Sequence, residues 1–542
     1  MARCRTLVDA LDEAARSAEG YTFISEGVET RRSYAEIRRA SERVARGLLA
    51  AGLKPGDLVA LVIADAEAFL TALFGAAQAG IVPATMAPPT TTGGLSQYFE
   101  LTMRTVRAAR ARAVITSRGL LAGFDAMRAR CTELALVVTP DDLARAERES
   151  PEAREPIAPA RGADDIALVQ FTSGSTSSPK GVALSHRNLC ANIDAINGPA
   201  GLGTSPDDSA VSWLPLYHDM GLVGMALGPL YSSRPALFLE PQAFIKRPVD
   251  WLKAISRHRA TVSFAPTFAY QLVLRRVSEQ DLIGLDLSCW RVAGCGAEPV
   301  HAPTLHAFAD RLAGVGFRPT SFLPCYGLAE HVLAATLPPR DRPLRTDASS
   351  VVSCGRPLPG HRLKVVKPDG TNARDGEPGE IVLSGPSVMQ GYLRDEATGA
   401  AVRAGWLHTG DLGYLYDGEL FVCGRAKDTI IINGRKYFPQ DLEWAIENLD
   451  GVRRGRVVAF GIVEHGANDR VVVAVEAGQR PGRERLVEDI RRRIADQFGL
   501  YVDDVVCVAA GTISRTTSGK IRRAAVKAHY EEGTLVNSGG GF

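Results

Sequence analysis

Short apolar runs alternate with amphipathic segments from the start of the chain to about residue 330. LVALVIA at 58–64 predicts a buried strand, EAFLTALFGAAQAG at 67–80 a helix, and IVPATM at 81–86 the next strand. FELTMRTVRAARA at 99–111 and AVITS at 113–117 repeat this alternation. Because helices packed on mostly parallel strands produce such an order, we predict a large N-terminal domain of layered α/β sheets.

The pattern changes at about residue 351. Short β-like pieces (RLKVVK, GEIVLSG and ELFVCG) are separated by DG and PG turns, which predicts a β-rich subdomain over about 351–425. After GRAKD, the segments RVVAFGIVE, DRVVVAVEAG, RERLVEDIRRRIADQFGL and DVVCVAAG follow a β-β-α-β order. We therefore expect a large domain over 1–427 and a small, mobile α+β domain over 428–542, joined at a hinge near 425–429.

The apolar run DIALVQF at 165–171 leads directly into the loop TSGSTSSPKG. Its unshielded backbone N–H groups, several hydroxyls and one mobile cation could together bind a polyphosphate. The candidate residues are Thr172, Ser173, Gly174, Ser175, Thr176 and Lys180. A solvated Gly/Ser turn is the alternative. The loop is not a Walker P-loop, since Pro179 precedes the lysine and Gly181 follows it, and it lacks the Rossmann G-x-G-x-x-G pattern.

Composition narrows the class of protein. A chain of 542 residues, 45% hydrophobic and 23% charged, is typical of a soluble globular protein. Its net charge of +2 gives no reason to expect nucleic acid as a partner. The nine cysteines form no C-x-x-C pair, which favours reduced thiols in a cytoplasmic protein. No secretory signal and no apolar run of about 18 residues are found, so no membrane span is predicted.

Six further segments follow the loop in order: SWLPLYHDMGL (212–222), GCGAEPV (294–300), YGLAE (326–330), GWLHTGDLGYL (405–415), GRAKDTIIINGRKYFPQDLE (424–443) and ISRTTSGKIRR (513–523). Together with the loop, they resemble the signature segments of the adenylate-forming superfamily. This superfamily contains acyl-CoA synthetases, the adenylation domains of nonribosomal peptide synthetases, and luciferases. Seven segments in family order, spread over about 350 residues, are far more specific than any one of them.

The resemblance implies an ATP site with Mg²⁺. Glu330 matches the residue that ligates Mg²⁺ on the ATP phosphates, a role that suits a hard cation. The alternative interpretation is that Glu330 is simply an acidic residue at the start of a surface helix. Ala329 stands where family members often carry threonine, so one hydroxyl to the phosphate is missing. The segments that line and follow the adenine face contain Gly296, Ala297, Glu298, Tyr326 and Gly327.

The later segments carry polar residues with implied roles. Asp411 matches the carboxylate that accepts hydrogen bonds from the ribose hydroxyls, and Arg425 matches an arginine that also binds the ribose. A β-turn aspartate and a solvated arginine are their alternatives. Asp428 matches the hinge position, whose backbone dihedral angles change when the small domain rotates.

Lys520 matches the lysine placed between the substrate carboxylate and the α-phosphate. A carboxylate that attacks phosphorus brings two anions together, and an ammonium group that bridges them lowers the repulsion in the transition state. On its own, a lysine in TTSGKIRR would be a solvated loop residue. His218 is interpreted as a wall and gate of the acyl pocket, with a core histidine as its alternative, because no metal-ligand spacing or G-x-S-x-G elbow accompanies it.

Three segments resemble fatty acyl-AMP ligases in particular: SWLPLYHDMGL, FAPTFAY (264–270) and GRKYFPQDLE. Such enzymes make a fatty acyl-adenylate and pass the acyl group to the pantetheine thiol of an acyl carrier protein, often on a polyketide or peptide synthetase. However, only 331–353 separate YGLAE from SCGRPLPG, which is short for the family insertion associated with poor use of CoA. Free CoA therefore remains an alternative acceptor, and a non-catalytic nucleotide-binding or acyl-adenylate-binding module is a further alternative.

Overall fold

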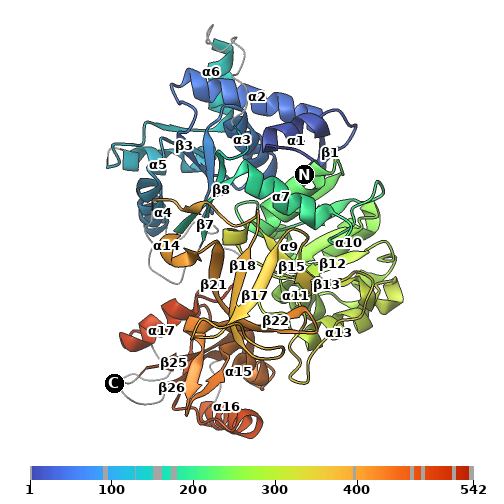
Figure 1. Cartoon of the computed structure of the whole chain (residues 1–542), viewed down its shortest axis with the longest axis vertical. Helices are drawn as coiled ribbons and strands as arrows, with labels where there is room; N and C mark the ends of the chain where they lie inside the picture. The colour runs from blue at the N-terminus through green and yellow to red at the C-terminus, as the bar shows by residue number, and fades with distance from the viewer. Residues whose placement is uncertain are drawn as a thin grey trace. The chain divides into compact units, whose positions relative to one another are not determined.

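The computed structural model describes residues 3–89, 95–128, 130–149, 162–172, 180–394, 398–463, 469–477, 482–515 and 520–535. The chain divides into two compact units (Figure 1). The first unit comprises 1–364, 382–409 and 416–421, and the second comprises 365–381, 410–415 and 422–542. Each unit is described by itself below.

Two seven-stranded sheets form the framework of the first unit. One has the order β13-β12-β11-β9-β10-β1-β2, with every neighbouring pair parallel except β1 and β2. Its strands are β1 (Gly20–Ser25), β2 (Val28–Ser33), β9 (Ala210–Ser212), β10 (Ala236–Leu239), β11 (Val262–Ala265), β12 (Val292–Cys295) and β13 (Phe322–Pro324).

The other sheet has the order β19-β8-β7-β4-β3-β5-β6. Its strands are β3 (Leu58–Val62), β4 (Val82–Thr85), β5 (Ala113–Thr116), β6 (Leu136–Val138), β7 (Ile166–Thr172), β8 (Lys180–Ser185) and β19 (Gly391–Tyr392). Pairing from β7 through β6 is parallel, whereas β8 runs antiparallel to both β7 and β19. All five residues of β3 are buried, as expected for a parallel strand that is covered on both faces.

Helices cover these sheets and connect their strands. The helices of the first unit are α1 (Leu7–Ala14), α2 (Tyr34–Ala50), α3 (Ala66–Gln78), α4 (Leu95–Ala109), α5 (Leu121–Arg128), α6 (Pro140–Glu149), α7 (His186–Asn197), α8 (Gly228–Tyr231), α9 (Pro241–Lys246), α10 (Val249–His258), α11 (Thr267–Arg276), α12 (Glu279–Leu282), α13 (Ala302–Leu312) and α14 (Thr398–Ala401). Short 3₁₀ turns are η1 (Arg118–Leu120), η4 (Ala313–Val315), η5 (Pro319–Ser321) and η6 (Ala329–His331), and η3 (Met220–Leu227) is a π-helix. Local sequence sets several helix starts: the Asp65 side chain accepts from Ala68 N at the start of α3, and Ser185 forms a capping box with Asn188 at the start of α7.

Smaller sheets follow in the sequence. Strands β14 (Tyr326–Gly327), β15 (Ala334–Leu337) and β16 (Arg356–Pro357) form a three-stranded sheet in the first unit. A further sheet has the order β17-β18-β21-β20, with β22 also pairing with β21, and the division into units passes through its strands. Its strands are β17 (Arg362–Val366), β18 (Gly379–Ser384), β20 (Val402–Arg403), β21 (Trp406–Tyr416) and β22 (Glu419–Arg425).

The second unit has a compact α+β core. It contains η7 (Ala426–Asp428), β23 (Ile430–Ile432), β24 (Arg435–Tyr437), α15 (Pro439–Ile446), β25 (Val452–Ile462), β26 (Arg470–Ala477), α16 (Arg483–Phe498), β27 (Asp504–Val508) and α17 (Arg523–Glu531). Strand β26 lies between β25 and β27, antiparallel to the first and parallel to the second.

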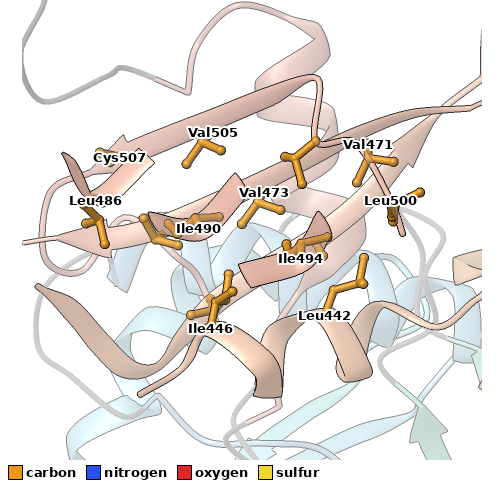
Figure 2. Packing of buried hydrophobic residues seen from close by; sticks show 14 of the residues in the cluster. Leu442, Ile446, Val471, Val473, Leu486, Ile490, Ile494, Leu500, Val505 and Cys507 are labelled. Carbon is orange, nitrogen blue, oxygen red and sulfur yellow. The ribbon is translucent and has the colours of Figure 1, made fainter. Parts of the chain in front are cut away.

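Both faces of β26 are buried, and alternate residues pack on opposite sides. Val471 and Val473 pack in a cluster with Leu442 and Ile446 of α15 and the apolar stripe of α16 (Figure 2). That stripe consists of Leu486, Ile490 and Ile494, at the four-residue spacing of one helix face. On the opposite side of the sheet, Val472 and Ala474 share a second cluster with Val526 of α17.

The predicted fold class is confirmed. The strands expected at 58–64, 81–86, 113–117 and 165–171 are β3, β4, β5 and β7, and the helices expected at 67–80 and 99–111 are α3 and α4. The β-β-α-β order after GRAKD corresponds to β25, β26, α16 and β27. The alternation of apolar runs with amphipathic segments therefore predicted the layers correctly.

All nine cysteines are free thiols, and seven of them are buried. Burial raises the pKa of the Cys190 thiol in the first unit to about 12, and burial likewise raises the pKa of Cys507 in the second. A membrane-crossing helix needs about 18 or more residues with few charges. Among the described helices, none meets this requirement.

Candidate functional site

The hydroxyl-rich loop begins where β7 ends and stops where β8 begins. Thr172, the last residue of β7, pairs with Lys180, the first residue of β8. Ser173, Gly174, Ser175 and Thr176 lie outside the described residues. The described ends of the loop are therefore two adjacent antiparallel strands, which hold Thr172 and Lys180 next to one another at one edge of the parallel sheet.

Tyr392 connects Lys180 with Glu330. The Nζ atom of Lys180 lies 4.7 Å from the centroid of the Tyr392 ring. The Tyr392 hydroxyl donates to Glu330 Oε1 at 2.9 Å. Tyr392 reaches this position because β19 pairs with β8, with Tyr392 opposite Val182. A cation and a carboxylate that are distant in the sequence thus contact the same aromatic side chain.

Glu330 is the middle residue of η6. Its carbonyl oxygen accepts a hydrogen bond from Met389 N at 2.9 Å, so the segment that leads into β19 holds the Glu330 backbone as well as its side chain. The carboxylate is half-buried and its Oε2 atom takes no part in the Tyr392 hydrogen bond. This leaves carboxylate oxygen available to a ligand.

The segment predicted to line the adenine face and the YGLAE segment that follows it lie at the carboxyl ends of two neighbouring parallel strands, β12 and β13. Cys325 N donates to Cys295 O at 2.8 Å, which places Gly296 beside Cys325. A Cβ at position 296 would lie 2.5 Å from Cys325 Sγ, so a larger residue here would displace the Cys325 side chain. In open α/β sheets, ligands bind outside the carboxyl ends of such strands.

The remaining residues of these two segments are also placed. Ala297 has a positive φ of 68°, and Glu298 Oε1 accepts from Phe268 N at 2.7 Å. Tyr326 and Gly327 form β14, directly after β13. The structure therefore gathers all five predicted residues of this group at one end of the sheet.

His218 stands two residues before the start of the π-helix η3, next to its N-cap Asp219. Its Nδ1 atom lies 2.6 Å from Asp219 Oδ1, and Asp219 Oδ1 also accepts from Met220 N at the start of η3. A π-helix is rare and is often found at functional sites. The predicted role of His218 in an acyl pocket stays a prediction.

In the second unit, the structure brings Asp411 and Arg425 together. Arg425, the last residue of β22, places Nε 3.1 Å from Asp411 Oδ1 on β21. The Asp411 side chain is only 9% exposed, whereas that of Arg425 is 53% exposed. Burial and the repulsion of Arg425 lower the pKa of the adjacent Lys427. The pair therefore offers one carboxylate and one guanidinium to a ligand that carries hydroxyl groups.

Asp428, the predicted hinge residue, is paired with a half-buried arginine. Asp428 Oδ2 lies 3.5 Å from Arg523 Nη1, and Glu443 Oε1 accepts from Arg523 Nη2 at 2.7 Å. Burial opposes the charge of Arg523, but the two carboxylates outweigh it and raise the pKa of this guanidinium. Arg523 is the first residue of α17 and stands three positions after Lys520.

Lys520 itself is half-buried in the second unit, three residues before the start of α17. The next residue, Ile521, forms an isolated antiparallel bridge with Arg515, and Arg522 N donates to Ser514 O at 3.0 Å. The proposed contact of Lys520 with substrate stays a prediction.

The donor set can also be tested for Mg²⁺. Within the described residues, no three His, Cys, Asp or Glu side chains form a group that could hold a metal ion. However, Mg²⁺ in nucleotide sites is commonly bound through one or two carboxylates together with phosphate oxygens and water. A single half-buried carboxylate beside the loop strands, such as Glu330, fits this mode of binding.

Two residues that contribute to this geometry were not identified from the sequence, namely Tyr392 and Arg523. The signal at Tyr392 is only a Gly-Tyr dipeptide within a loop-rich stretch, and its importance depends on the pairing of β19 with β8. Arg523 lies within the ISRTTSGKIRR segment, but its partners Asp428 and Glu443 come from two other segments. Neither contact could be read from spacing.

The fold and these contacts define a class: an α/β protein with a candidate nucleotide site outside the carboxyl ends of parallel strands. The family model described as AMP-binding enzyme matches residues 11–393, and the model described as Disco-interacting protein 2-like, AMP domain, matches 427–538. The chain belongs to the AMP-binding enzyme family.

Individual relatives agree with this assignment. A Caulobacter vibrioides protein named "Putative acyl-CoA synthetase" is 38% identical, covering 98% of this chain and 96% of that protein. The medium-chain-fatty-acid–acyl-carrier-protein ligase JamA of Moorena producens is 33% identical, with the same coverage. A solved structure from a study of fatty acyl-adenylate ligases from E. coli and L. pneumophila is 36% identical, with a TM-score of 0.91 and 98% of each chain covered.

Proposed function

We propose that this protein activates a fatty acid with ATP and Mg²⁺ to form an acyl-adenylate, and then transfers the acyl group to the phosphopantetheine thiol of an acyl carrier protein. The observation that supports the proposal most directly is the meeting of Lys180 and Glu330 on Tyr392, where the hydroxyl-rich loop leaves the parallel sheet. These groups suit the phosphates of a nucleotide and its metal ion.

The first proposed step is attack of a fatty acid carboxylate oxygen on the α-phosphorus of ATP. The new C–O–P bond forms as the bond to the β-phosphate oxygen breaks, and pyrophosphate leaves. Lys520 neutralises the negative charge that accumulates between the carboxylate and the phosphate. Thr172, Lys180 and the loop between them bind the phosphates. Glu330 would hold Mg²⁺, which would supply positive charge to the phosphate oxygens.

The rest of the site positions the nucleotide and the acid. Asp411 accepts hydrogen bonds from the ribose hydroxyls and Arg425 binds the same sugar, while the segments at Gly296–Glu298 and Tyr326–Gly327 line the adenine. His218 forms part of the acyl pocket wall. Asp428 is the hinge at which the second unit changes orientation between the two steps.

In the second step, a thiolate attacks the acyl carbonyl carbon and AMP leaves. AMP is a better leaving group than the oxide of a free acid, which is why activation precedes transfer. A carrier protein acceptor is supported by the similarity to JamA, whose name specifies that acceptor. The nine free thiols suit a reducing compartment, and we place the reaction in the cytoplasm.

Free CoA is the second candidate acceptor, and a specific observation favours it. The chain between Glu330 and Cys354 forms η6, β15 and a loop with a single isolated bridge inside it, Thr346 with Val352. The sequence is short here for the insertion associated with poor use of CoA. The Caulobacter relative is also named as an acyl-CoA synthetase.

The proposal is tested by ATP–pyrophosphate exchange over a panel of fatty acids of increasing length. We expect exchange with one range of chain lengths, and a Glu330→Gln variant that has lost most of it. Exchange with none of the acids would contradict the proposal and favour a non-catalytic binding module. Preformed acyl-adenylate is then offered to a phosphopantetheinylated carrier protein and to free CoA in parallel, and thioester formation with each identifies the acceptor.

A further inference from the structure

Val332, two residues after Glu330, has an unusual backbone conformation. Its φ is 66° and its ψ is −65°, and Leu333 N donates to His331 O at 2.8 Å. Residues 331–333 therefore form a γ-turn of the rare type with positive φ, which is strained for L-amino acids. A β-branched residue at positive φ is a conformational outlier. The Val332 side chain is also completely buried, at 0% exposure.

Hydrogen bonds hold the chain on both sides of this turn. Before it, Met389 N donates to Glu330 O at 2.9 Å. After it, Asn192 of α7 forms two bonds with Ala334: its Nδ2 donates to the carbonyl at 2.8 Å, and its Oδ1 accepts from the amide at 3.3 Å. A Cβ at Gly327 would collide with the Leu333 carbonyl, so the turn also packs directly on the β14 backbone. Met389, Asn192 and the backbone of β14 therefore hold the strained turn in place.

The same turn contains an incompletely paired buried side chain. His331 is 0% exposed; its Nδ1 lies 3.2 Å from Ala334 O, and its Nε2 has no hydrogen-bond partner. The His361 ring stands 5.0 Å away, and His361 Nε2 instead bonds Ser387 Oγ at 2.6 Å. A strained turn and an unpaired buried nitrogen both reduce stability, and such features persist where they serve a site.

We infer that the Val332 turn is a positioning element for Glu330, an inference that rests on the proposed function. The turn reverses the chain with a single residue, so Glu330 can stay beside Tyr392 while Ala334 joins β14 opposite Gly327. A relaxed turn would need more chain between these two fixed points and would move Glu330 relative to Tyr392. Val332 thereby sets the distance between the metal-binding carboxylate and the phosphate loop strands.

The experiment uses the full chain and replaces Val332 by glycine, which adopts positive φ without strain, and by alanine, which retains a Cβ. ATP binding is measured by calorimetry with and without Mg²⁺, along with the exchange rate and the thermal midpoint. Wild type should bind ATP more tightly with Mg²⁺. This Mg²⁺ effect should fall severalfold in Val332→Ala, which keeps the strain of positive φ but loses the buried side chain that holds the turn, and less in Val332→Gly, which keeps positive φ without strain. Exchange should fall in the same order, by up to about 10²-fold for alanine, because a displacement of about 1 Å can have an effect of that size.

Three controls make the outcomes distinguishable. Asp341→Gly removes another positive φ, at an exposed residue outside the segments proposed to bind the nucleotide, and should leave binding and exchange unchanged. Tyr392→Phe, which removes the hydroxyl bonded to Glu330, should reduce the Mg²⁺ effect as Val332→Ala does. Activity losses that follow the thermal midpoint, with equal loss in the alanine and glycine variants, would show a packing role only and overturn the inference. Failure of the wild type to bind ATP would instead overturn the proposed function.

Discussion

The two units hold their predicted site residues by different kinds of contact. In the first, Lys180 and Glu330 meet at the ring and hydroxyl of Tyr392, and the Glu330 backbone is bound by Met389. In the second, the contacts are between full charges: Arg425 with Asp411, and Arg523 with Asp428 and Glu443. In the first unit, the pairing of backbone segments therefore fixes the positions of the site residues. In the second unit, the attraction between opposite charges fixes them.

This contrast has a physical consequence. A hydrogen bond to a backbone group fixes a position almost independently of salt, whereas an exposed charge pair weakens as ionic strength rises. The first unit should thus be sensitive to changes in backbone conformation and to acid. The second should be sensitive to the loss of single charges. The predictions below test this division, beginning with the largest expected effect.

Replacing Lys520 by alanine should have the largest effect. Loss of one charge contact to the transition state costs roughly 10²–10³-fold in rate, or about 2.7–4 kcal/mol. ATP–pyrophosphate exchange measures the loss, and calorimetry should show that ATP binding is largely retained. Lys436→Ala, which removes an exposed lysine of β24 in the same unit, is the control and should leave exchange nearly unchanged. Equal exchange by both variants would refute the role of Lys520.

Arg523→Met should destabilise the second unit. It leaves the Asp428 and Glu443 carboxylates close together with no guanidinium between them, and breaking partly buried ion pairs in this way should cost up to about 3 kcal/mol. Hydrogen exchange of the β26 amides reports this unit separately from the first. Arg492→Met removes a guanidinium with a 69% exposed side chain on α16 and should change stability by less than about 0.5 kcal/mol. If Arg523→Met changed the stability of the second unit as little as Arg492→Met does, the charge pairs of Arg523 would not be what stabilises this unit.

Acid should act on the first unit through His331. Burial, with a smaller contribution from the nearby His361, lowers the pKa of His331 from 6.5 to about 3, so the folded state keeps this imidazole neutral. Below about pH 6.5 the His331 imidazole becomes protonated in the unfolded chain, whereas it stays neutral in the folded chain. Stability is therefore complete above pH 6.5 and falls by about 1.4 kcal/mol per pH unit towards the folded pKa.

Hydrogen exchange of the first unit between pH 7 and pH 5 measures this slope. The same measurement on His331→Gln should give a slope that is lower by about one proton. An unchanged slope in this variant would mean that His331 is not the group that titrates on unfolding.

Arg425→Gln should have the smallest effect on stability. The pair with Asp411 is exposed on the arginine side, and such pairs contribute about 0.2–1 kcal/mol. Chemical denaturation at low and high salt should show a small difference between wild type and variant that disappears at high salt. Affinity for AMP should nevertheless decrease if Arg425 binds the ribose. A large destabilisation that does not depend on salt would show that this pair is not held by charge attraction alone.

The layered fold could be predicted because it follows from local patterns. The five buried residues of β3 and the following helix are visible as an apolar run and an amphipathic segment, and the same holds for β26 and α16. The order of the motifs along the chain was enough to select Lys180, Glu330, Asp411 and Arg425 as candidate site residues. The structure then places Asp411 next to Arg425.

Long-range pairing could not be predicted in the same way. Tyr392 matters only because β19 adds to β8, and a one-residue change of register would turn its ring to the other face of the sheet. The γ-turn at Val332 depends on anchors from Asn192 and Met389, which local sequence does not reveal. Valine itself is unfavourable at positive φ, so propensity alone argues against the observed conformation. Such contacts depend on tertiary structure.

The buried cysteines make the opening of each unit measurable without added labels. Only the thiolate reacts quickly with alkylating reagents, and the raised pKa values of Cys190 and Cys507 suppress that form while both thiols are enclosed. Alkylation of Cys190 therefore reports transient exposure of the first unit, and alkylation of Cys507 that of the second. Mass spectrometry of the two peptides over time would give two independent opening rates from a single sample.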